Sequence, residues 1–296
     1  MSGLVSQSKA VLSTIKFRHS VFALPFALTG ALLALRGTAM GPGAIAWKLG
    51  WIVIAMVAAR SAAMAFNRLV DASIDKENPR TEDRALPRGD LSKRFTAGFV
   101  VVSSLALVAA AAQLNPLCLK LSPLALAVSL GYSFTKRFTA LSHLVLGAAL
   151  GAAPAAAWIA VRGSFDPEIL YLSAAVAFWT AGFDIIYSCQ DVDFDRAAGL
   201  HSVAAHLGVS NALTVSRTLH AAMVVSLAAA WWAMDLELLA LAGVGTVGVL
   251  LIYEQSLVRA DDLSRVDAAF FSVNGWVSVL FFAFWAADVW LAVPLP

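Results

Sequence analysis

The chain has 296 residues, of which 60% are hydrophobic and only 14% are charged, and its mean hydropathy is +0.77. A composition this apolar lies outside the range of soluble globular proteins and predicts an all-α, polytopic membrane protein. Two cysteines are too few for a disulfide framework, and no basic tail or aromatic-interleaved basic patch indicates a nucleic-acid partner. We expect a single integral-membrane domain over residues 1–296.

Apolar stretches long enough to cross a bilayer recur along the whole chain. Turn-forming pairs such as Asn115-Pro116 and Asp166-Pro167 separate them. We therefore predict a bundle of about nine transmembrane helices around a central cavity that opens to the cytoplasmic side. The predicted spans are 20–36, 47–70, 95–112, 117–135, 141–160, 168–188, 212–234, 238–258 and 273–293.

Lysine and arginine are distributed unevenly between the two sides of this predicted bundle. Fifteen fall at the N-terminus or follow the second, fourth, sixth and eighth spans, whereas four lie on the other side: Arg36, Lys48, Lys120 and Arg162. Cytoplasmic loops are enriched in these residues. The N-terminus and the mouth of the cavity are therefore predicted to be cytoplasmic, with the C-terminus on the opposite side of the inner cell membrane.

A first acidic motif, consisting of Asn67, Asp71 and Asp75, begins while the second span is still apolar. At about 100° per residue, positions i, i+4 and i+8 share one face of a helix. Their hard oxygen atoms suit Mg²⁺, which completes its shell with water and substrate phosphates. Arg80 and Arg84 follow and supply positive charge for phosphate oxygens. The alternative is a helix end that runs into a solvated, positively charged loop.

A second acidic motif, consisting of Asp184, Asp191 and Asp195, follows the sixth span. Its positions i, i+7 and i+11 again share one helical face, with Tyr187 beside Asp184. Two such motifs on the same side of the membrane are expected to face each other and to hold two divalent ions and a diphosphate. Aromatic residues near the motifs are candidates to line a chamber that stabilises a carbocation: Phe66, Phe178, Phe183 and Tyr187.

Several basic residues have both a functional and a structural interpretation. Lys136 and Arg137 either close the mouth over the diphosphate or form a positive-inside pair. Arg60 lies in mid-helix, where an arginine is functional by default, and it either clamps an acceptor carboxylate or is a paired structural residue. Arg68 is expected to point about 100° away from the first acidic motif, towards the lipid interface.

Two further sets of basic or histidine residues are not assigned to the metal and diphosphate site. Lys16, Arg18 and His19 are expected to form an interfacial basic collar, with binding of an acidic acceptor as the alternative. Three further histidines lack the spacing of metal ligands: His143, His201 and His206.

These motifs resemble those of the UbiA superfamily of intramembrane aromatic prenyltransferases. The resemblance runs from about residue 16 to residue 210 and rests on four segments. They are Asn67-x-x-x-Asp71-x-x-x-Asp75, Arg84-Ala-Leu-Pro-Arg-Gly89, Tyr132-x-Phe-x-Lys136-Arg137 with Leu146-Gly147-Ala-Ala-Leu-Gly151, and Asp184-x-x-Tyr187-x-x-x-Asp191-x-x-x-Asp195 followed by Gly199-x-x-Ser202.

The resemblance implies Mg²⁺-dependent transfer of a polyprenyl group from a polyprenyl diphosphate to an aromatic acid, in ubiquinone or menaquinone biosynthesis. The metal ligands that it implies are Asn67, Asp71, Asp75, Asp191 and Asp195. The catalytic residues are Asp71, Asp191, Tyr187, Lys136 and Arg137. The implied substrate-binding residues are Arg60, Arg80, Arg84, Lys136, Arg137 and Asp184.

Two departures from the 4-hydroxybenzoate enzymes bear on the acceptor. Arg68 stands where those enzymes usually have Asp, and Ala85 stands where the loop usually has Pro. The segment from Arg60 to Arg68 is closer to relatives that serve menaquinone synthesis through naphthoates. The sequence leaves the acceptor, the prenyl length and the oligomeric state open. A membrane transporter that uses intramembrane acids is the alternative function, although its site is expected nearer the membrane midplane.

Overall fold

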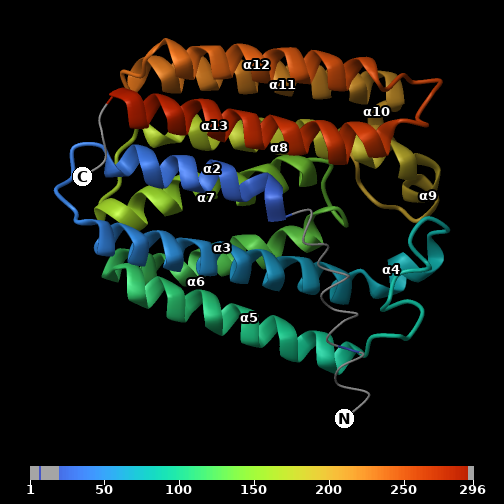
Figure 1. The fold of residues 1–296 in the computed structure, drawn as a ribbon. Helices are drawn as coiled ribbons and strands as arrows, with labels where there is room; N and C mark the ends of the chain where they lie inside the picture. The colour runs from blue at the N-terminus through green and yellow to red at the C-terminus, as the bar shows by residue number, and fades with distance from the viewer. Residues whose placement is uncertain (1–6, 8–19, 293–296) are drawn as a thin grey trace. The chain divides into compact units, whose positions relative to one another are not determined.

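The computed structural model describes residue 7 and residues 20–292, and these residues form helices joined by short loops (Figure 1). The long helices are α2 (Ser20–Leu35), α3 (Pro42–Val70), α5 (Lys93–Leu114), α6 (Pro116–Thr135), α7 (Ser142–Arg162), α8 (Ile169–Ser188), α11 (Val209–Ala233), α12 (Leu238–Ser256) and α13 (Asn274–Ala292). The short ones are α4 (Ala72–Glu77), the 3₁₀ turn η2 (Cys189–Asp191), α9 (Val192–Ala197), α10 (Val203–Leu207) and the π-helix η3 (Ala268–Val273).

The helical architecture confirms the prediction of an all-α membrane protein. Within the described residues, eight helices are long and apolar enough to cross a membrane. The apolar part of α2, Ala23–Leu35, is shorter than such a span. The predicted helix boundaries agree with the observed ones to within a few residues. The additional short helices all lie in segments that the hydropathy pattern treats as loops or as continuations of a span.

The helices group into two compact units. The first unit comprises Met1–Ser20 and Trp51–Phe134, and the second comprises Val21–Gly50 and Thr135–Pro296. The first acidic motif belongs to the first unit and the second acidic motif to the second. The prediction of one domain over the whole chain stays a prediction.

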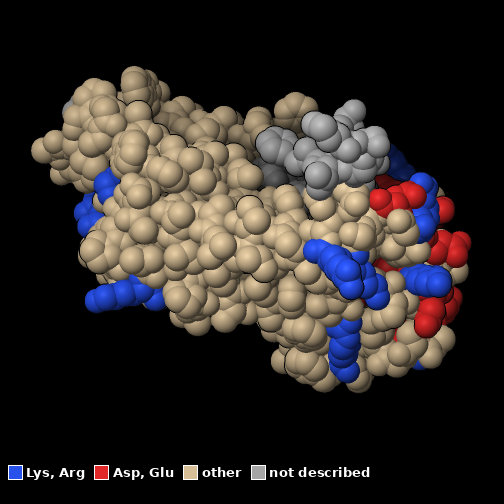
Figure 2. Space-filling model, turned by 90° about the horizontal axis from the view of Figure 1, so that it is seen from below, with Lys and Arg blue, Asp and Glu red and all other residues tan. Residues whose placement is uncertain are grey.

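Exposed apolar side chains cover the long helices of both units. Leu105 on α5 is 63% exposed and Ile252 on α12 is 73% exposed, although both are aliphatic. Figure 2 shows the same feature as a broad surface without charge along the helices, whereas Lys, Arg, Asp and Glu gather towards helix ends. Such a surface is stable only in contact with lipid tails, because exposing this much apolar area to water would cost a large amount of free energy. The protein is therefore an integral membrane protein.

Small residues bring α7 and α8 into close contact in the second unit. A Cβ atom added at Gly147 would lie 2.3 Å from the carbonyl oxygen of Ala177, and one at Gly151 would lie 2.5 Å from that of Ser173. In lipid, helices associate through such close backbone packing because no hydrophobic driving force acts between them. The Gly147-x-x-x-Gly151 spacing thus fixes α8, which carries part of the second acidic motif, against α7.

Two arginines on the predicted non-cytoplasmic side bind the carbonyl ends of helices. Arg36 donates from Nη1 to the carbonyl of Met234, which ends α11, at 2.6 Å. Arg162 donates from Nε to the carbonyl of Ala34, in the last turn of α2, at 3.0 Å. The last carbonyls of a helix lack intrahelical partners and carry partial negative charge. These two arginines are therefore structural residues that close helix ends.

Candidate active site

The first acidic motif lies at a break between two helices. Helix α3 ends at Val70, and Asp71 precedes α4 with φ −89° and ψ 3°. The assumption of one unbroken helix face is therefore wrong at Asp71. The i to i−4 hydrogen bonds of a helix are kept across the break. The N–H of Asp71 donates to the carbonyl of Asn67 at 2.9 Å, and the N–H of Asp75 donates to that of Asp71 at 2.7 Å. Successive side chains of the motif thus stay one helical turn apart along the backbone.

The carboxylates of this motif are buried, and basic residues compensate one of them. Asp71 is 2% exposed and Asp75 is 5% exposed. Asn67 donates from Nδ2 to Oδ2 of Asp71 at 3.1 Å, and Nη1 of Arg84 lies 2.7 Å from Oδ1 of Asp75. Buried carboxylates require such partners because isolated charge is costly in an apolar interior. The structure therefore pairs Asp75, a predicted metal ligand, with Arg84, a predicted substrate-binding residue.

Arg68 also belongs to this site, so its predicted direction is wrong. Its Nη1 atom lies 3.8 Å from Oδ2 of Asp75, and that oxygen is buried and has no hydrogen-bond partner. The prediction compared only the directions of Cα–Cβ bonds on an ideal helix. A long arginine side chain spans that angle, and the helix break at Asp71 changes the direction of Asp75.

The loop that carries Arg84 is anchored at both ends. Thr81 donates from Oγ1 to the backbone carbonyl of Asp75 at 3.0 Å. Leu86 and Leu91 are 8% and 2% exposed, and they form a small hydrophobic cluster. The residues packed against this cluster are Met64, Ala85, Phe95 and Phe99. This anchoring fixes the backbone on both sides of Arg84 and hence the direction of its guanidinium group.

Arg80 and Arg60 occupy different environments in the same unit. Arg80 is exposed, and its backbone N–H donates to Oδ1 of Asn78 at 2.9 Å. Arg60 lies within α3, where its Nε atom is buried without a hydrogen-bond partner and its guanidinium interacts electrostatically with Tyr132. A buried donor without a partner is costly. Arg60 therefore retains hydrogen-bonding capacity that an anionic ligand would satisfy.

The second acidic motif also departs from one regular helix. Helix α8 ends at Ser188, the 3₁₀ turn η2 contains Asp191, and α9 then carries Asp195. A 3₁₀ turn has three residues per turn and a longer rise than an α-helix. The prediction of a common α-helical face for Asp184, Asp191 and Asp195 is therefore wrong beyond Ser188. The turn changes the directions in which the side chains of Asp191 and Asp195 leave the backbone relative to that of Asp184.

Asp184 is held by a histidine that the sequence pattern did not identify as a site residue. Nδ1 of the buried His143 lies 2.7 Å from Oδ2 of Asp184, whose side chain is 27% exposed. The backbone N–H of Val203 donates to Nε2 of His143 at 3.4 Å. Nε2 is then the acceptor, so the proton of a neutral imidazole resides on Nδ1 and is donated to Asp184. His143 and Asp184 are 41 positions apart in the sequence, which explains why spacing rules missed this pair.

Lys136, Asp191 and a serine surround the carboxylate of Asp195. The side chain of Ser202 hydrogen-bonds Asp195, Lys136 attracts it electrostatically, and Asp191 is a nearby like charge. The carbonyl of Lys136 also accepts the backbone N–H of His201 at 2.7 Å. The tertiary structure therefore brings Lys136 to the second acidic motif. Two neighbouring carboxylates beside one ammonium group leave an excess of negative charge for a cation.

Aromatic rings lie beside Tyr187, which precedes Asp191 in the sequence. The Tyr187 ring is 4.2 Å from the Phe270 ring between centroids, at an interplanar angle of 31°, and 6.2 Å from the Phe271 ring. Phe183 contacts Phe270 edge to face at 5.2 Å. Phe183 and Tyr187 were predicted to line a chamber, whereas Phe270 and Phe271 were missed. Both missed residues lie in the π-helix η3, far along the chain from the motif.

The remaining predicted residues are placed as follows. Arg137 is partly buried in the loop after α6. Phe66 contacts Phe134 in the first unit at 5.7 Å between ring centroids. The basic residues Lys16, Arg18 and His19 lie outside the described residues.

The donor chemistry of the two motifs fits a hard divalent cation. Carboxylate and amide oxygens are the ligands that Mg²⁺ takes from proteins, together with water and phosphate. Within residue 7 and residues 20–292, no group of three or more His, Cys, Asp or Glu side chains lies close enough to form a metal site unaided.

Comparison with known proteins agrees with the helical fold and the motifs. The chain matches the UbiA prenyltransferase family over residues 23–286. It is 31% identical to a 4-hydroxybenzoate octaprenyltransferase from Thiobacillus denitrificans over 241 residues, covering 80% of each chain. The apo structure of a UbiA homolog from Aeropyrum pernix K1 matches with a TM-score of 0.82 and 37% identity, covering 91% of this chain and 98% of that one. A UbiA homolog from Archaeoglobus fulgidus bound to GPP and Mg²⁺ matches with a TM-score of 0.71 at 19% identity, covering 95% and 99%. The chain therefore belongs to the UbiA prenyltransferase family and is a prenyltransferase.

Proposed function

We propose that this enzyme transfers a polyprenyl group from a polyprenyl diphosphate to a hydroxylated aromatic acid in ubiquinone or menaquinone biosynthesis. The observation that carries the proposal is the pair of oxygen-rich motifs at helix ends, each with a basic residue at its carboxylates: Arg84 at Asp75 and Lys136 at Asp195. Family membership and the names of the octaprenyltransferase relatives support it. The transporter alternative lacks a comparable observation, since the family that matches is one of enzymes.

The proposal assigns Mg²⁺ binding to Asn67 and Asp71 in the first motif and to Asp191 and Asp195 in the second. When bound, Mg²⁺ would supply Lewis-acid stabilisation of the negative charge on the leaving diphosphate. The Archaeoglobus fulgidus structure contains GPP and Mg²⁺, but at its identity it establishes only the fold. The assignment therefore rests on the oxygen donors of this chain. Asp75 is proposed mainly to orient Arg84.

Basic side chains are proposed to bind the diphosphate oxygens. Lys136 and Arg137 follow α6, while Arg80 and Arg84 follow α4. Arginine and lysine form short, strong hydrogen bonds with phosphate oxygens because both partners are charged. Arg84 is held in one direction by Asp75, so it loses little conformational freedom on binding. Asp184, fixed by His143, is proposed to support the substrate side of the second motif.

The reaction requires a broken C–O bond and a new C–C bond. As the allylic C–O bond breaks, its electron pair leaves with the diphosphate, and positive charge develops on the allylic carbons. A ring carbon next to the acceptor hydroxyl then bonds to the terminal allylic carbon, and the ring proton passes to water or to the released diphosphate. Aromatic faces such as that of Tyr187 stabilise the developing cation. An apolar bundle excludes the water that would otherwise trap it.

The acceptor is proposed to be held through its carboxylate by Arg60. This residue has a buried donor without a partner, which a carboxylate would satisfy. Arg68 and Ala85 depart from the pattern of the 4-hydroxybenzoate enzymes, whereas the relative from Thiobacillus denitrificans is a 4-hydroxybenzoate octaprenyltransferase, so both classes of acceptor belong in the test. Arg60→Gln should raise the acceptor KM by about 10-fold or more, as expected for a lost charge-assisted contact. An unchanged acceptor KM would leave Arg60 a structural residue.

The proposed function is tested with purified protein in lipid bilayers and labelled geranyl or farnesyl diphosphate. Prenylated product should form with one class of a panel containing 4-hydroxybenzoate, 1,4-dihydroxy-2-naphthoate and 1,4-dihydroxy-6-naphthoate. Product should require Mg²⁺ and disappear in EDTA. Full turnover in EDTA would contradict the proposed role of the metal, and the absence of product with every acceptor would contradict the proposed acceptor class.

The orientation of the enzyme is proposed to place the loop after α4 in the cytoplasm. The basis is the unequal distribution of Lys and Arg. In a chain carrying Cys118→Ala and Cys189→Ala, an Asp83→Cys thiol should react with a membrane-impermeant reagent in inside-out vesicles and not in intact cells. The reverse pattern would overturn the orientation.

A further inference from the structure

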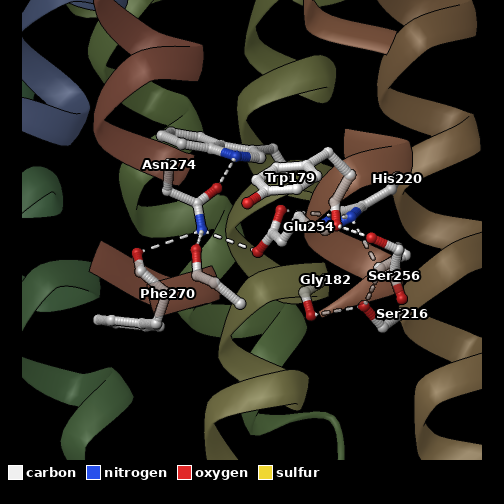
Figure 3. Close-up of polar contacts among 11 residues, drawn as sticks. Trp179, Gly182, Ser216, His220, Glu254, Ser256, Phe270 and Asn274 are labelled. Carbon is white, nitrogen blue, oxygen red and sulfur yellow. Dashed lines mark hydrogen bonds and ion pairs between the residues drawn. The ribbon is translucent and has the colours of Figure 1, made fainter. Parts of the chain in front are cut away.

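Three buried residues form a polar node among α8, α12 and α13 (Figure 3). Trp179, Glu254 and Asn274 each have a relative exposure of 0%. Polar and ionisable groups are expensive inside a membrane bundle, and they are found there mainly where they serve a function. The acidic motifs and basic residues described above do not involve this node.

The hydrogen bonds of the node determine the orientation of the Asn274 amide. Trp179 donates from Nε1 to Oδ1 of Asn274 at 2.6 Å, and Asn274 donates from Nδ2 to Oε1 of Glu254 at 2.9 Å. An indole N–H can only donate, so the amide oxygen must face Trp179 and the amide nitrogen must face Glu254. Glu254 and Trp179 thus hold the Asn274 side chain from its two ends.

The same amide nitrogen binds the π-helix η3, which immediately precedes Asn274. Nδ2 lies 3.1 Å from the carbonyl oxygen of Ala269 and 3.2 Å from that of Phe270. A π-turn interrupts the regular series of helical hydrogen bonds, so carbonyls at its boundary need donors from elsewhere. The two amide hydrogens of Asn274 serve three acceptors, two of which belong to η3. Asn274 therefore stabilises the π-turn directly.

The π-turn determines which rings contact Tyr187. The Phe270 ring packs against Tyr187 in a tilted arrangement at 4.2 Å between centroids, and the Phe271 ring lies 6.2 Å from the same ring. In an α-helix each residue advances by about 100°, so replacing a π-turn with regular helix would change the directions of these rings relative to α13. Tyr187 precedes Asp191 of the second acidic motif by one helical turn of sequence. π-turns of this kind are frequent at functional sites.

We propose that Asn274, held by Glu254 and Trp179, is a positioning residue that keeps Phe270 and Phe271 against Tyr187 beside the second acidic motif. The resulting aromatic wall faces the allylic end of the prenyl donor. Its ring faces stabilise the positive charge that develops as the C–O bond breaks and its electron pair leaves with the diphosphate. This inference rests on the proposed function for its chemical role, but the hydrogen-bond support of η3 stands independently of the reaction.

The first test replaces Asn274 with an apolar residue of similar size. Asn274→Leu removes every hydrogen bond of the node and should increase amide hydrogen exchange in residues 268–274. It should lower kcat for prenyl transfer by about 10-fold, the upper range for a displaced aromatic face, while KM for geranyl diphosphate changes less than about threefold. The effect falls on kcat because positive charge on the allylic carbons develops only after the substrate has bound, as the C–O bond breaks.

Two matched variants separate positioning from general stability. Glu254→Gln retains an acceptor oxygen for Asn274, so both kcat and the exchange pattern should stay close to those of the unchanged enzyme. Ser216→Ala removes two other hydrogen bonds in the same unit without touching η3: Oγ donates to the carbonyl of Gly182 at 2.9 Å and accepts from Nε2 of Gln255 at 2.9 Å. It should leave exchange in residues 268–274 and kcat nearly unchanged. An equal loss of kcat in Ser216→Ala and Asn274→Leu would overturn the proposal.

Phe270→Leu provides a test that does not depend on whether Asn274→Leu folds. It leaves the Asn274 side-chain bonds in place and removes the ring that stacks on Tyr187, so it should reproduce the loss of kcat without the increase in exchange. Normal kcat in Phe270→Leu, or unchanged exchange in a folded Asn274→Leu protein, would overturn the proposal. If the unchanged enzyme transferred no prenyl group to any acceptor, the proposed function would fail, and the exchange measurements would still decide whether Asn274 supports η3.

Discussion

The two acidic motifs use similar carboxylates but differ in how the surrounding structure compensates their charge. In the first, Asp71 and Asp75 are almost fully buried, and Arg84 forms an ion pair with Asp75. In the second, Asp184 is partly exposed and binds a histidine, while Asp195 binds a serine hydroxyl. The carboxylate of Asp75 is therefore charge-balanced before any ligand binds. The second motif keeps more negative charge, which suits a cation that arrives with its substrate.

This difference also separates the residues that hold the structure from those that meet substrate. Asp75 holds Arg84, and the loop around Arg84 is anchored by Leu86 and Leu91. Arg84 is thus held in one direction before any ligand binds. In the second motif, the 3₁₀ turn η2 contains Asp191, and Lys136 is the cation near Asp195.

The largest effect is expected from single variants that remove a proposed metal ligand from either motif. Asp71→Asn and Asp191→Asn preserve side-chain shape but remove the charge, and each should lower kcat/KM by about 1,000-fold, which corresponds to several kcal/mol of lost electrostatic stabilisation. Glu77→Gln and Asp193→Asn, which alter exposed acids beside each motif, are the matched controls and should retain activity. Steady-state kinetics at saturating Mg²⁺ provide the measurement. Strong loss in one motif only would show that the motifs do not act together.

The next effect concerns the basic pair near the second motif. Lys136→Ala or Arg137→Ala removes a charge-assisted contact of about 1.5 to 3 kcal/mol, which is about 10- to 150-fold in an equilibrium constant. We expect most of the loss in kcat, because charge on the departing oxygens grows in the transition state. The acceptor KM should change little. The control is Arg94→Ala, which changes an exposed arginine. Normal kinetics for both Lys136→Ala and Arg137→Ala would mean that this pair serves only to set the membrane orientation.

Stability should respond to charge removal in the first motif more than in the second. Arg84→Met leaves Asp75 buried without its nearest cation and should lower the free energy of unfolding by about 2 kcal/mol, less than for a fully buried pair because Arg84 is 25% exposed. Asp75→Asn in the same chain should recover part of that loss. Asp184→Asn keeps an acceptor for His143 and should cost less than about 1 kcal/mol. Thermal unfolding in detergent compares the three, and equal losses at Arg84 and Asp184 would contradict the comparison.

The smallest effect is expected from the coupling between Arg68 and Asp75. Because their charged atoms are 3.8 Å apart and Arg68 is partly exposed, a double-mutant cycle with Arg68→Gln and Asp75→Asn should give a coupling energy of about 0.2 to 1 kcal/mol. Strict additivity of the two changes would place Arg68 at the lipid interface, as helix geometry alone predicts.

Much of the fold and part of the site followed from local sequence properties. Helix positions were predictable because an apolar run of about 20 residues has few alternatives to a helix in lipid. Asp71, Asp191 and Lys136 could be chosen as candidate site residues from the sequence because charge is rare in such a chain and therefore conspicuous. The short helices α4, α9 and α10 were not predictable in this way, since runs of five or six residues have no clear hydrophobic period.

The sequence by itself determined that the chain is a helical membrane protein with two acidic motifs, because hydropathy and residue spacing act over one helix at a time. Only the tertiary structure decided the partners of those motifs: His143 for Asp184, Arg68 and Arg84 for Asp75, and Phe270 for Tyr187. These partners come from other helices, from across a helix break or from a distant loop. Their contacts depend on packing and on the 3₁₀ and π turns, and periodicity along one helix does not encode either of these.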